Sequence, residues 1–186
     1  MTPPDWPTGT YASVVIDPPW DYGVTQRLAG KGRRQASARA TYATLTPAEV
    51  AALPVPDLLG DGGHVWLWIP NAGLLAGWHL DVLDAWGLRP VSLVTWVKRG
   101  QPTLGRYARG TTEHVVLAVN GWGGVPDVPL PATHFDAAKG AHSVKPACLG
   151  DLAEQLKPDG PWCELFARQP RLGWSSWGHG YEGLAS

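Results

Sequence analysis

The residues Asp17-Pro18-Pro19-Trp20 place a carboxylate, two prolines and an aromatic ring directly after a β-branched run. Proline fixes φ and donates no backbone hydrogen bond, so the pattern predicts a rigid corner whose carbonyls are free to accept hydrogen bonds from a ligand. The Asp17 carboxylate is a further acceptor, so the corner could hold both hydrogens of an exocyclic amine while Trp20 offers a flat face to the attached ring. The alternative interpretation is a strand-ending turn with a packed tryptophan.

Adenine carries an amine of this kind. Its lone pair is delocalised into the purine, so the amine attacks an electrophile only when hydrogen-bond acceptors draw it out of the ring plane and hold it in line. A methylated sulfonium is a suitable electrophile for such an amine. The corner therefore indicates methyl transfer to a planar amine as the chemistry to test against the rest of the chain.

Two segments carry basic residues and no acid, one at about 22–45 and the other at 99–112. Both lack an apolar period, which is typical of loops. Grouped cationic side chains are suited to phosphate contacts, and nearby tyrosines are suited to stacking on bases. Solvated surface loops are the alternative interpretation. The residues expected to contact nucleic acid are Tyr22, Arg27, Lys31, Arg33, Arg34, Arg39, Arg99, Arg106 and Arg109, with Tyr42 and Tyr107 as further stacking candidates.

Composition limits the classes of protein that these residues can belong to. Of 186 residues, 44% are hydrophobic and 17% charged, so we expect one globular domain over residues 1–186. The formal net charge of −1 leaves nucleic-acid binding to the two basic segments. No apolar run predicts a membrane span or a secretory leader. Cys148 and Cys163 have no metal-binding spacing and predict neither a disulfide framework nor a zinc site, which suits the reducing cytoplasm.

The elements that must position the corner alternate between strands and helices. Thr46-Pro47-Ala48-Glu49 has the spacing of a capping box with proline at the first helical position. The alternation predicts an α/β sheet with helices on both faces, and ligands of such sheets bind beyond the carboxyl ends of the strands, where Asp17 lies. Strand patterns cover 11–16, 64–70, 91–98, 113–120 and 162–167, and helix patterns cover 46–53, 72–86 and 146–156.

Seven blocks from about Tyr11 to Gly180, in this order, carry a family resemblance. The chain resembles the N6-adenine methyltransferases related to the catalytic subunit of the eukaryotic mRNA adenosine methyltransferase, a family with many bacterial and phage members. The blocks are DPPW at 17–20, TYATLTPAEV, HVWLWIPN, AWGLRPVSLVTWVKRG, TTEHVVLAVNG, HSVKP at 142–146 and ELFARQPRLGWSSWGHG.

The resemblance implies a single Rossmann-like methyltransferase domain with circularly permuted motif order and a mixed sheet flanked by helices. It implies direct methyl transfer from S-adenosylmethionine to the N6 amine of adenine, without a metal. In accordance with the permuted order, no G-x-G-x-x-G follows the first strand. The resemblance assigns catalysis to Asp17, Pro18, Pro19 and Trp20, and cofactor binding to Asp17, Ser143, Lys145, Phe166, Arg168 and His179, with Lys145 pairing with the methionine carboxylate and Glu164 as a secondary candidate.

One departure from the family concerns the ribose of the cofactor. Many relatives carry an asparagine followed by an acid or amide after the final Trp-Gly, whereas this chain has His179-Gly180. His179 could supply one of the expected hydrogen bonds, and Gly180 cannot supply a side chain. An ordinary surface position for His179 is the alternative.

A base within a duplex cannot reach such a corner, so the expected partner is nucleic acid with a flipped or unpaired adenine, with DNA favoured over RNA. A homodimer is an open alternative for the assembly. Rival functions are methylation of another planar amine, such as cytosine N4 or a glutamine amide, and a catalytically silent nucleic-acid-binding subunit. Silent subunits typically lose the acid or the aromatic residue of the corner, and Asp17 and Trp20 are both present here.

Overall fold

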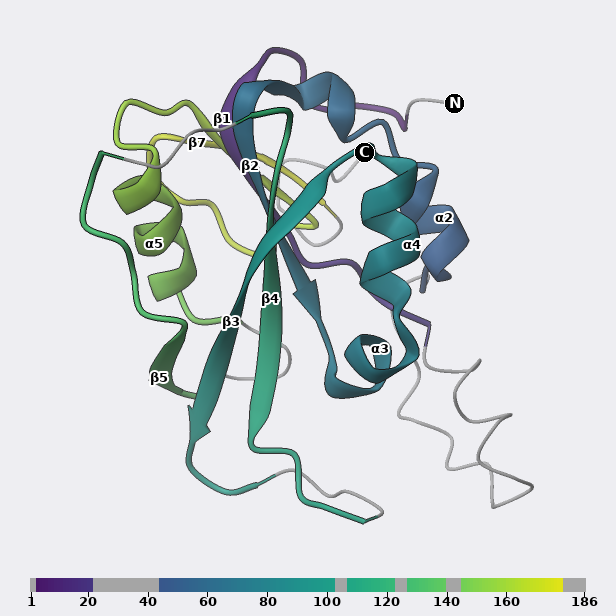
Figure 1. The fold of residues 1–186 in the computed structure, drawn as a ribbon, viewed down its shortest axis with the longest axis vertical. Helices are drawn as coiled ribbons and strands as arrows, with labels where there is room; N and C mark the ends of the chain where they lie inside the picture. The colour runs from purple at the N-terminus through teal and green to yellow at the C-terminus, as the bar shows by residue number, and fades with distance from the viewer. Residues whose placement is uncertain (1–2, 22–43, 103–106, 123–126, 140–144, 179–186) are drawn as a thin grey trace.

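The computed structural model describes residues 3–21, 44–102, 107–122, 127–139 and 145–178. These residues form one seven-stranded sheet with the strand order β5-β3-β4-β2-β1-β6-β7 (Figure 1). The strands are β1 Tyr11–Ile16, β2 Leu59–Ile69, β3 Arg89–Arg99, β4 Thr112–Val119, β5 His134–Ala138, β6 Trp162–Leu165 and β7 Trp174–Trp177.

The sheet is mixed. Strand β1 pairs in parallel with β2 on one side and with β6 on the other, and β7 continues in parallel from β6. Strand β4 runs antiparallel to β2 and β3, while β5 is parallel to β3. The predicted α/β class with a mixed sheet is therefore confirmed. The carboxyl ends of β1, β2 and β6 meet at one edge, which places the residue after β1 beside the ends of two parallel neighbours.

Helices cover the sheet on both faces (Figure 1). On one face, α2, α3 and α4 close a core that includes Ile16, Leu67 and Leu83. On the other, α5 covers a second core that includes Val15 and Trp66. The alternation of side chains along β1 and β2 sends neighbouring residues to opposite cores, as the pleat of a strand requires. The helices are α2 Pro47–Ala51, α3 Asn71–Ala76, α4 Trp78–Ala85 and α5 Cys148–Leu156, with a 3₁₀ turn at Pro56–Leu58.

Two local predictions are confirmed by the structure. Strand β1 has the predicted bounds, Tyr11–Ile16. Helix α2 begins with a complete capping box, in which the Thr46 hydroxyl accepts from the Glu49 amide and the Glu49 carboxylate accepts from the Thr46 amide at 2.8 Å. These hydrogen bonds satisfy donors that the first turn of a helix leaves without partners.

Several elements differ from the prediction. The helix expected over 72–86 is two helices, because Gly77 adopts a left-handed φ of 77° that ends α3 and redirects the chain into α4. Strand β2 begins at Leu59 rather than at His64, since its glycine-rich start pairs with neighbouring strands instead of turning. Strands β5 and β7 are absent from the prediction. Both are short strands at the two edges of the sheet, with few buried side chains to mark them.

No helix in the described part of the chain is long and apolar enough to cross a membrane. Both cysteines are unpaired thiols, Cys163 buried on β6 and Cys148 partly exposed at the start of α5.

Candidate active site

Backbone hydrogen bonds fix the corner that follows β1. The Trp20 amide donates to the Pro18 carbonyl at 2.8 Å, and the Leu45 amide donates to the Pro19 carbonyl at 2.8 Å. Each proline carbonyl thus already accepts one backbone hydrogen bond, so neither is as free as the sequence suggested. A carbonyl oxygen has two lone pairs, so Pro18 retains the capacity to accept one more hydrogen bond.

The Trp20 ring is part of the core. Its exposed fraction is 4%, its indole Nε1 donates to the Trp68 carbonyl at 2.9 Å, and its ring packs 5.7 Å from that of Trp78. The expectation that Trp20 offers an open face to a base is thus wrong for this conformation. The buried indole instead anchors the corner to the end of β2, and Asp17 is the residue of the corner that lines the neighbouring pocket.

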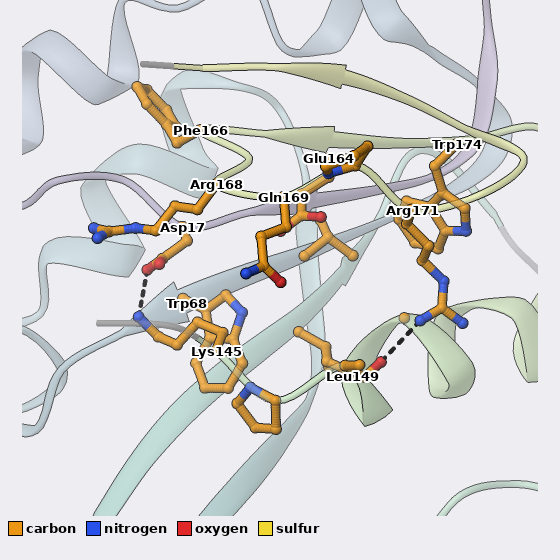
Figure 2. A pocket seen from close by; sticks show the side chains of 15 residues that line it. Asp17, Trp68, Lys145, Leu149, Glu164, Phe166, Arg168, Gln169, Arg171 and Trp174 are labelled. Carbon is orange, nitrogen blue, oxygen red and sulfur yellow. Dashed lines mark hydrogen bonds and ion pairs between the residues drawn. The ribbon is translucent and has the colours of Figure 1, made fainter. Parts of the chain in front are cut away.

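A pocket opens beside Asp17, between the sheet and the start of α5 (Figure 2). Strands β1, β2 and β6 form its base, the connection from β6 to β7 forms one wall, and the first turn of α5 with the residues before it forms another. Figure 2 shows Asp17 and Lys145 at one side of the hollow, Gln169 near its centre and Arg171 at the far side. The other lining residues include Val15, Trp68, Pro146, Leu149, Glu164, Phe166, Arg168 and Trp174.

Charged side chains of alternating sign run along one side of this pocket. Lys145 Nζ lies 2.7 Å from Asp17 Oδ1 and 3.5 Å from Glu113 Oε2. Glu113 Oε1 in turn lies 2.5 Å from Lys98 Nζ. Lys145 also lies over the ring of Trp68, with its Nζ 5.0 Å from the ring centroid. A buried charge requires a partner of opposite sign, and this row of charges provides one at every step.

The pKa values of the two glutamates at the site, Glu113 and Glu164, are shifted in opposite directions. Burial alone would raise the pKa of Glu113, but the nearby charges of Lys145 and Lys98 outweigh it and lower the pKa, so Glu113 is an anion. Burial, reinforced by the negative charge of Asp17, raises the pKa of Glu164 to about 7. Glu164 can therefore donate or accept a hydrogen bond near neutral pH.

Arg171 fixes α5 against the pocket wall. Its Nε donates to Glu154 at 2.9 Å, its Nη2 to Asp151 at 2.5 Å and its Nη1 to the Ala147 carbonyl at 3.0 Å. The guanidinium lies so close to the helix that a Cβ on Gly150 would come within 2.7 Å of it. Glycine at position 150 thus lets the arginine bind the first turn of α5, which holds the segment that carries Lys145.

The family is settled by comparison with known proteins. The model of the MT-A70 family matches residues 11–180, most of the chain. The chain belongs to the MT-A70 family. This methyltransferase family is the one that the seven sequence blocks indicated, and the corner at 17–20 lies within the matched region.

Relatives among curated proteins are distant in sequence but cover most of this MT-A70 chain. The Type II methyltransferase M.MunI of Mycoplasma sp is 27% identical over 192 residues, which is 94% of this chain and 79% of the relative. The N(6)-adenine-specific methyltransferase METTL4 of Homo sapiens is 26% identical over 91% of this chain and 37% of its own length. The human N(6)-adenosine-methyltransferase catalytic subunit METTL3 is 26% identical over 95% of this chain and 29% of its own length. The chain thus spans about a third of the METTL proteins.

Several residues that the MT-A70 resemblance assigns to a site come together in the structure. Asp17, Lys145, Phe166 and Arg168 all line the pocket, and so does the secondary candidate Glu164. Their roles stay predictions. The cofactor candidates Ser143 and His179 and the nucleic-acid candidates Tyr22, Arg27, Lys31, Arg33, Arg34, Arg39, Tyr42 and Arg106 lie outside the described residues.

Phe166 has an unusual backbone. Its φ of 61° is in the left-handed region, which non-glycine residues adopt rarely and often at functional sites. Its ring packs edge-on at 5.2 Å against Trp177. Gly178 is buried directly against its main chain, since a Cβ on Gly178 would lie 2.6 Å from the Phe166 carbonyl carbon. The Trp-Gly pair near the end of the chain therefore supports the bend that brings Phe166 to the pocket.

Three basic-segment residues lie in the described ranges. Arg99, Tyr107 and Arg109 are exposed at the edge where the corner lies, and Arg99 Nε approaches Asp136 Oδ1 at 3.8 Å. Sequence reasoning missed Glu113, Lys98 and Arg171. Glu113 opens the EHVVL strand next to a basic loop, which was an available signal, whereas nothing in the sequence pairs Arg171 with α5. Within the described ranges, no three His, Cys, Asp or Glu side chains gather closely enough to hold a metal ion.

Proposed function

We propose that this MT-A70 member transfers a methyl group from S-adenosylmethionine to the N6 amine of adenine in nucleic acid. The observation that carries the proposal is the pairing of Asp17 and Lys145, 2.7 Å apart, where a ligand pocket adjoins the rigid corner after β1. Carboxylate and ammonium side by side can bind the two charges of an amino acid. The same carboxylate borders the corner that can receive a second ligand.

The groups that line the pocket fit the proposed cofactor. Asp17 would bind its ammonium and Lys145 its carboxylate, since a lysine suits a compact anion. Glu164 and Gln169 carry hydrogen-bonding groups for ribose hydroxyls, and Phe166 and Arg168 are placed beside them for the nucleoside. When bound, the cofactor would supply an electrophilic methyl group on a sulfonium.

The corner would orient the target amine. Asp17 and the remaining lone pair of the Pro18 carbonyl can each accept one of its hydrogens, which favours a pyramidal nitrogen with its lone pair directed at the methyl group. The nitrogen would gain the methyl group as the bond from methyl carbon to sulfur breaks and would lose a proton, which the Asp17 carboxylate at the corner could accept. Because Trp20 is buried, the base must be held by groups other than this indole.

A flipped or unpaired adenine would reach the corner over the basic segments. Arg99 and Arg109 are exposed there as candidates for phosphate contacts, and Tyr107, 96% exposed, is a candidate for stacking on a base. The basic residues of segment 22–45 would complete this surface. The two ends of that segment are joined at the corner, where the Asp21 amide donates to the Leu45 carbonyl at 2.8 Å. We propose DNA as the substrate, with RNA as the alternative.

Nucleoside mass spectrometry tests the proposal. The protein is incubated with S-adenosylmethionine and with matched DNA and RNA oligonucleotides, single- and double-stranded, and the products are digested. N6-methyladenosine or its deoxy form is expected from the native protein, and at least about a thousandfold less from Asp17→Asn. The matched control is Asp57→Asn, which removes an exposed carboxylate from the 3₁₀ turn.

Each rival function gives a different product in this assay. Methylated cytosine without methylated adenine would identify a cytosine N4 enzyme. Methylated glutamine in added protein extract, with unmodified oligonucleotides, would identify an amide methyltransferase. Oligonucleotide binding without any methylated product would identify a silent binding subunit.

A further inference from the structure

Four charged side chains from four parts of the fold form one continuous row at the pocket. Lys98 lies on β3, Glu113 on β4, Lys145 just before α5 and Asp17 after β1. Their side chains are 12%, 27%, 20% and 12% exposed, respectively, so none is fully solvated. Only Asp17 and Lys145 line the pocket itself, while Glu113 stands behind Lys145.

We propose that Glu113 is a positioning residue that takes over Lys145 when a cationic ligand group occupies Asp17. The inference rests on the proposed function in one respect, namely that the incoming group is the ammonium of an amino-acid-bearing nucleoside. Lys145 then gives up its contact with Asp17 and is held by Glu113, outside the pocket, while its remaining N–H groups face the ligand's carboxylate. Asp17 becomes available to the ligand without leaving a buried lysine unpaired.

The geometry of Glu113 supports this exchange. Its Oε1 binds Lys98 at 2.5 Å, and its other oxygen, Oε2, faces Lys145 at 3.5 Å. The first contact holds the carboxylate in place, and the second already lies close to hydrogen-bond distance. A displacement of well under an ångström would convert the longer contact into a hydrogen bond. Lys145 can therefore keep an ion pair throughout the exchange.

The cost of the exchange without Glu113 shows why a second carboxylate is needed. A cationic ligand at Asp17 meets Lys145, a like charge that already contacts Oδ1 of the same carboxylate. Without Glu113, this partly buried lysine would have to exchange the protein carboxylate of Asp17 for the ligand's own carboxylate, which weakens the compensation of its charge. With Glu113 present, the bound state has a carboxylate for each cation. Lowering of the Glu113 pKa by Lys145 and Lys98 agrees with a carboxylate that stays charged through both states.

A purely structural role for Glu113 is the competing explanation. Lys98 and Glu113 lie on neighbouring antiparallel strands, where Glu113 is opposite Trp96, so their ion pair could simply join β3 to β4. The two explanations differ in what Glu113 does for ligands. A structural pair affects every ligand of the pocket alike, whereas a positioning residue affects only ligands that carry the ammonium.

The test measures binding of two nucleosides by isothermal titration calorimetry. S-adenosylhomocysteine carries the amino-acid group, and 5′-methylthioadenosine lacks it. Glu113→Gln is expected to weaken S-adenosylhomocysteine about tenfold and to leave 5′-methylthioadenosine within twofold. In a Lys145→Met background the effect of Glu113→Gln on S-adenosylhomocysteine should disappear, because there is no lysine left to position. Asp136→Asn, which removes the β5 carboxylate that pairs with Arg99, is the matched control and should change neither affinity.

The outcomes separate this inference from the proposed function. Equal weakening of both nucleosides, or an undiminished effect of Glu113→Gln in the Lys145→Met background, would overturn the positioning role. Binding of neither nucleoside by the native protein would instead overturn the proposed cofactor. In that case a thermal-unfolding cycle on ligand-free Glu113→Gln, Lys145→Met and the double variant still decides the inference. A direct interaction predicts non-additive changes in the free energy of unfolding, and additive changes would refute it.

Discussion

The two faces of the sheet use the same strands for different purposes. On the face of α2, α3 and α4, the side chains of β1 and β2 are apolar and buried, and the helices close over them. On the face of α5, the next residues along the same strands include Asp17 and Trp68, and the helix leaves a pocket over them. The titratable side chains of the site, Glu164 among them, lie on this second face.

The difference follows from how each covering layer is attached. Helices α3 and α4 follow β2 in the chain. Helix α4 packs on the sheet through Val82 and Leu83, which are at most 1% exposed. Helix α5 packs through one apolar stripe, and its first turn is held by the polar side chain of Arg171. The contacts of α4 with the core on its face are apolar, whereas at the first turn of α5 the contacts include polar side chains. The pocket therefore lies beside the part of α5 that the polar contacts of Arg171 hold in place.

The largest expected effect on activity is on the face of α5, which carries the pocket and is called the open face. Asp17→Asn keeps the shape of the side chain and removes the charge that would hold both ligands. We expect the rate of methyl transfer to fall by about 10³-fold or more, with a small change in the free energy of unfolding, because Lys145 still has Glu113 as a partner. Single-turnover kinetics and urea unfolding measure the two quantities. A variant that lost stability in proportion to activity would contradict the division between the faces.

On the face covered by α2, α3 and α4, called the closed face, a substitution is expected to lower stability and leave activity nearly unchanged. Leu83→Ala removes a side chain that is 1% exposed in the core beneath α4. The cavity should lower the free energy of unfolding by about 2–5 kcal/mol, as large-to-small core substitutions do. At temperatures where the variant is folded, KM for both substrates should stay within about twofold of the native value. A large rise in KM would mean that the closed face also shapes the pocket.

The sequence predicted which residues line the pocket better than it predicted the contacts that surround the pocket. Residues with an obvious chemical pattern, such as Asp17 and Lys145, line one pocket as expected. Tertiary packing decided the rest. Trp20 follows two prolines that suggest an exposed corner, yet its indole donates to a carbonyl on β2, 48 positions away. No local pattern reveals that contact, and the same holds for Arg171 and its carboxylate partners on α5.

Edge strands were missed for a related reason. Hydrophobic periodicity marks a strand only where one side of it is buried, and the described side chains of β5 are exposed or half-buried. Its residues join the sheet through main-chain pairing with β3, which leaves no trace in residue type. The glycines at the start of β2 conceal that strand in the same way.

Two titratable groups on the face of α5 sharpen the comparison further. His64 is enclosed in the protein, whereas Glu164 lines the pocket. Burial, with a smaller contribution from the charge of Lys157, lowers the pKa of His64 to about 4, and its side chain is 3% exposed. Between about pH 6.5 and pH 4, His64 therefore binds a proton in the unfolded chain but not in the native state. Stability should fall as pH falls through this window, by at most about 3 kcal/mol from His64 alone.

Glu164 should act in the opposite sense. Its pKa is raised to about 7, so its neutral form is favoured by folding, and its contribution is present below its ordinary pKa and lost as pH rises toward 7. Urea unfolding of His64→Gln and Glu164→Gln from pH 4 to pH 8 should give differences from the native protein with opposite slopes. Slopes of the same sign would refute the assignment of an enclosed base and a pocket-lining acid to one face.

The smallest expected effect concerns the attachment of α5. Arg171→Met keeps most of the aliphatic length but removes the hydrogen bonds to Glu154, Asp151 and the Ala147 carbonyl. The first turn of α5 should loosen, and affinity for S-adenosylhomocysteine should fall by about three- to tenfold, because these are partly exposed ion pairs of modest strength. Calorimetry measures this change.

The matched control is an arginine at the opposite end of the sheet. Arg89 lies over the Trp122 ring at 5.8 Å, much as Arg171 lies over Trp174 at 5.5 Å, but it starts β3 far from the corner. Arg89→Met should therefore leave the affinity unchanged. If both variants weakened binding equally, Arg171 would owe its effect to general packing on tryptophan. If only Arg171→Met did so, the ion pairs that fix the first turn of α5 would be what keeps the pocket shaped for a ligand.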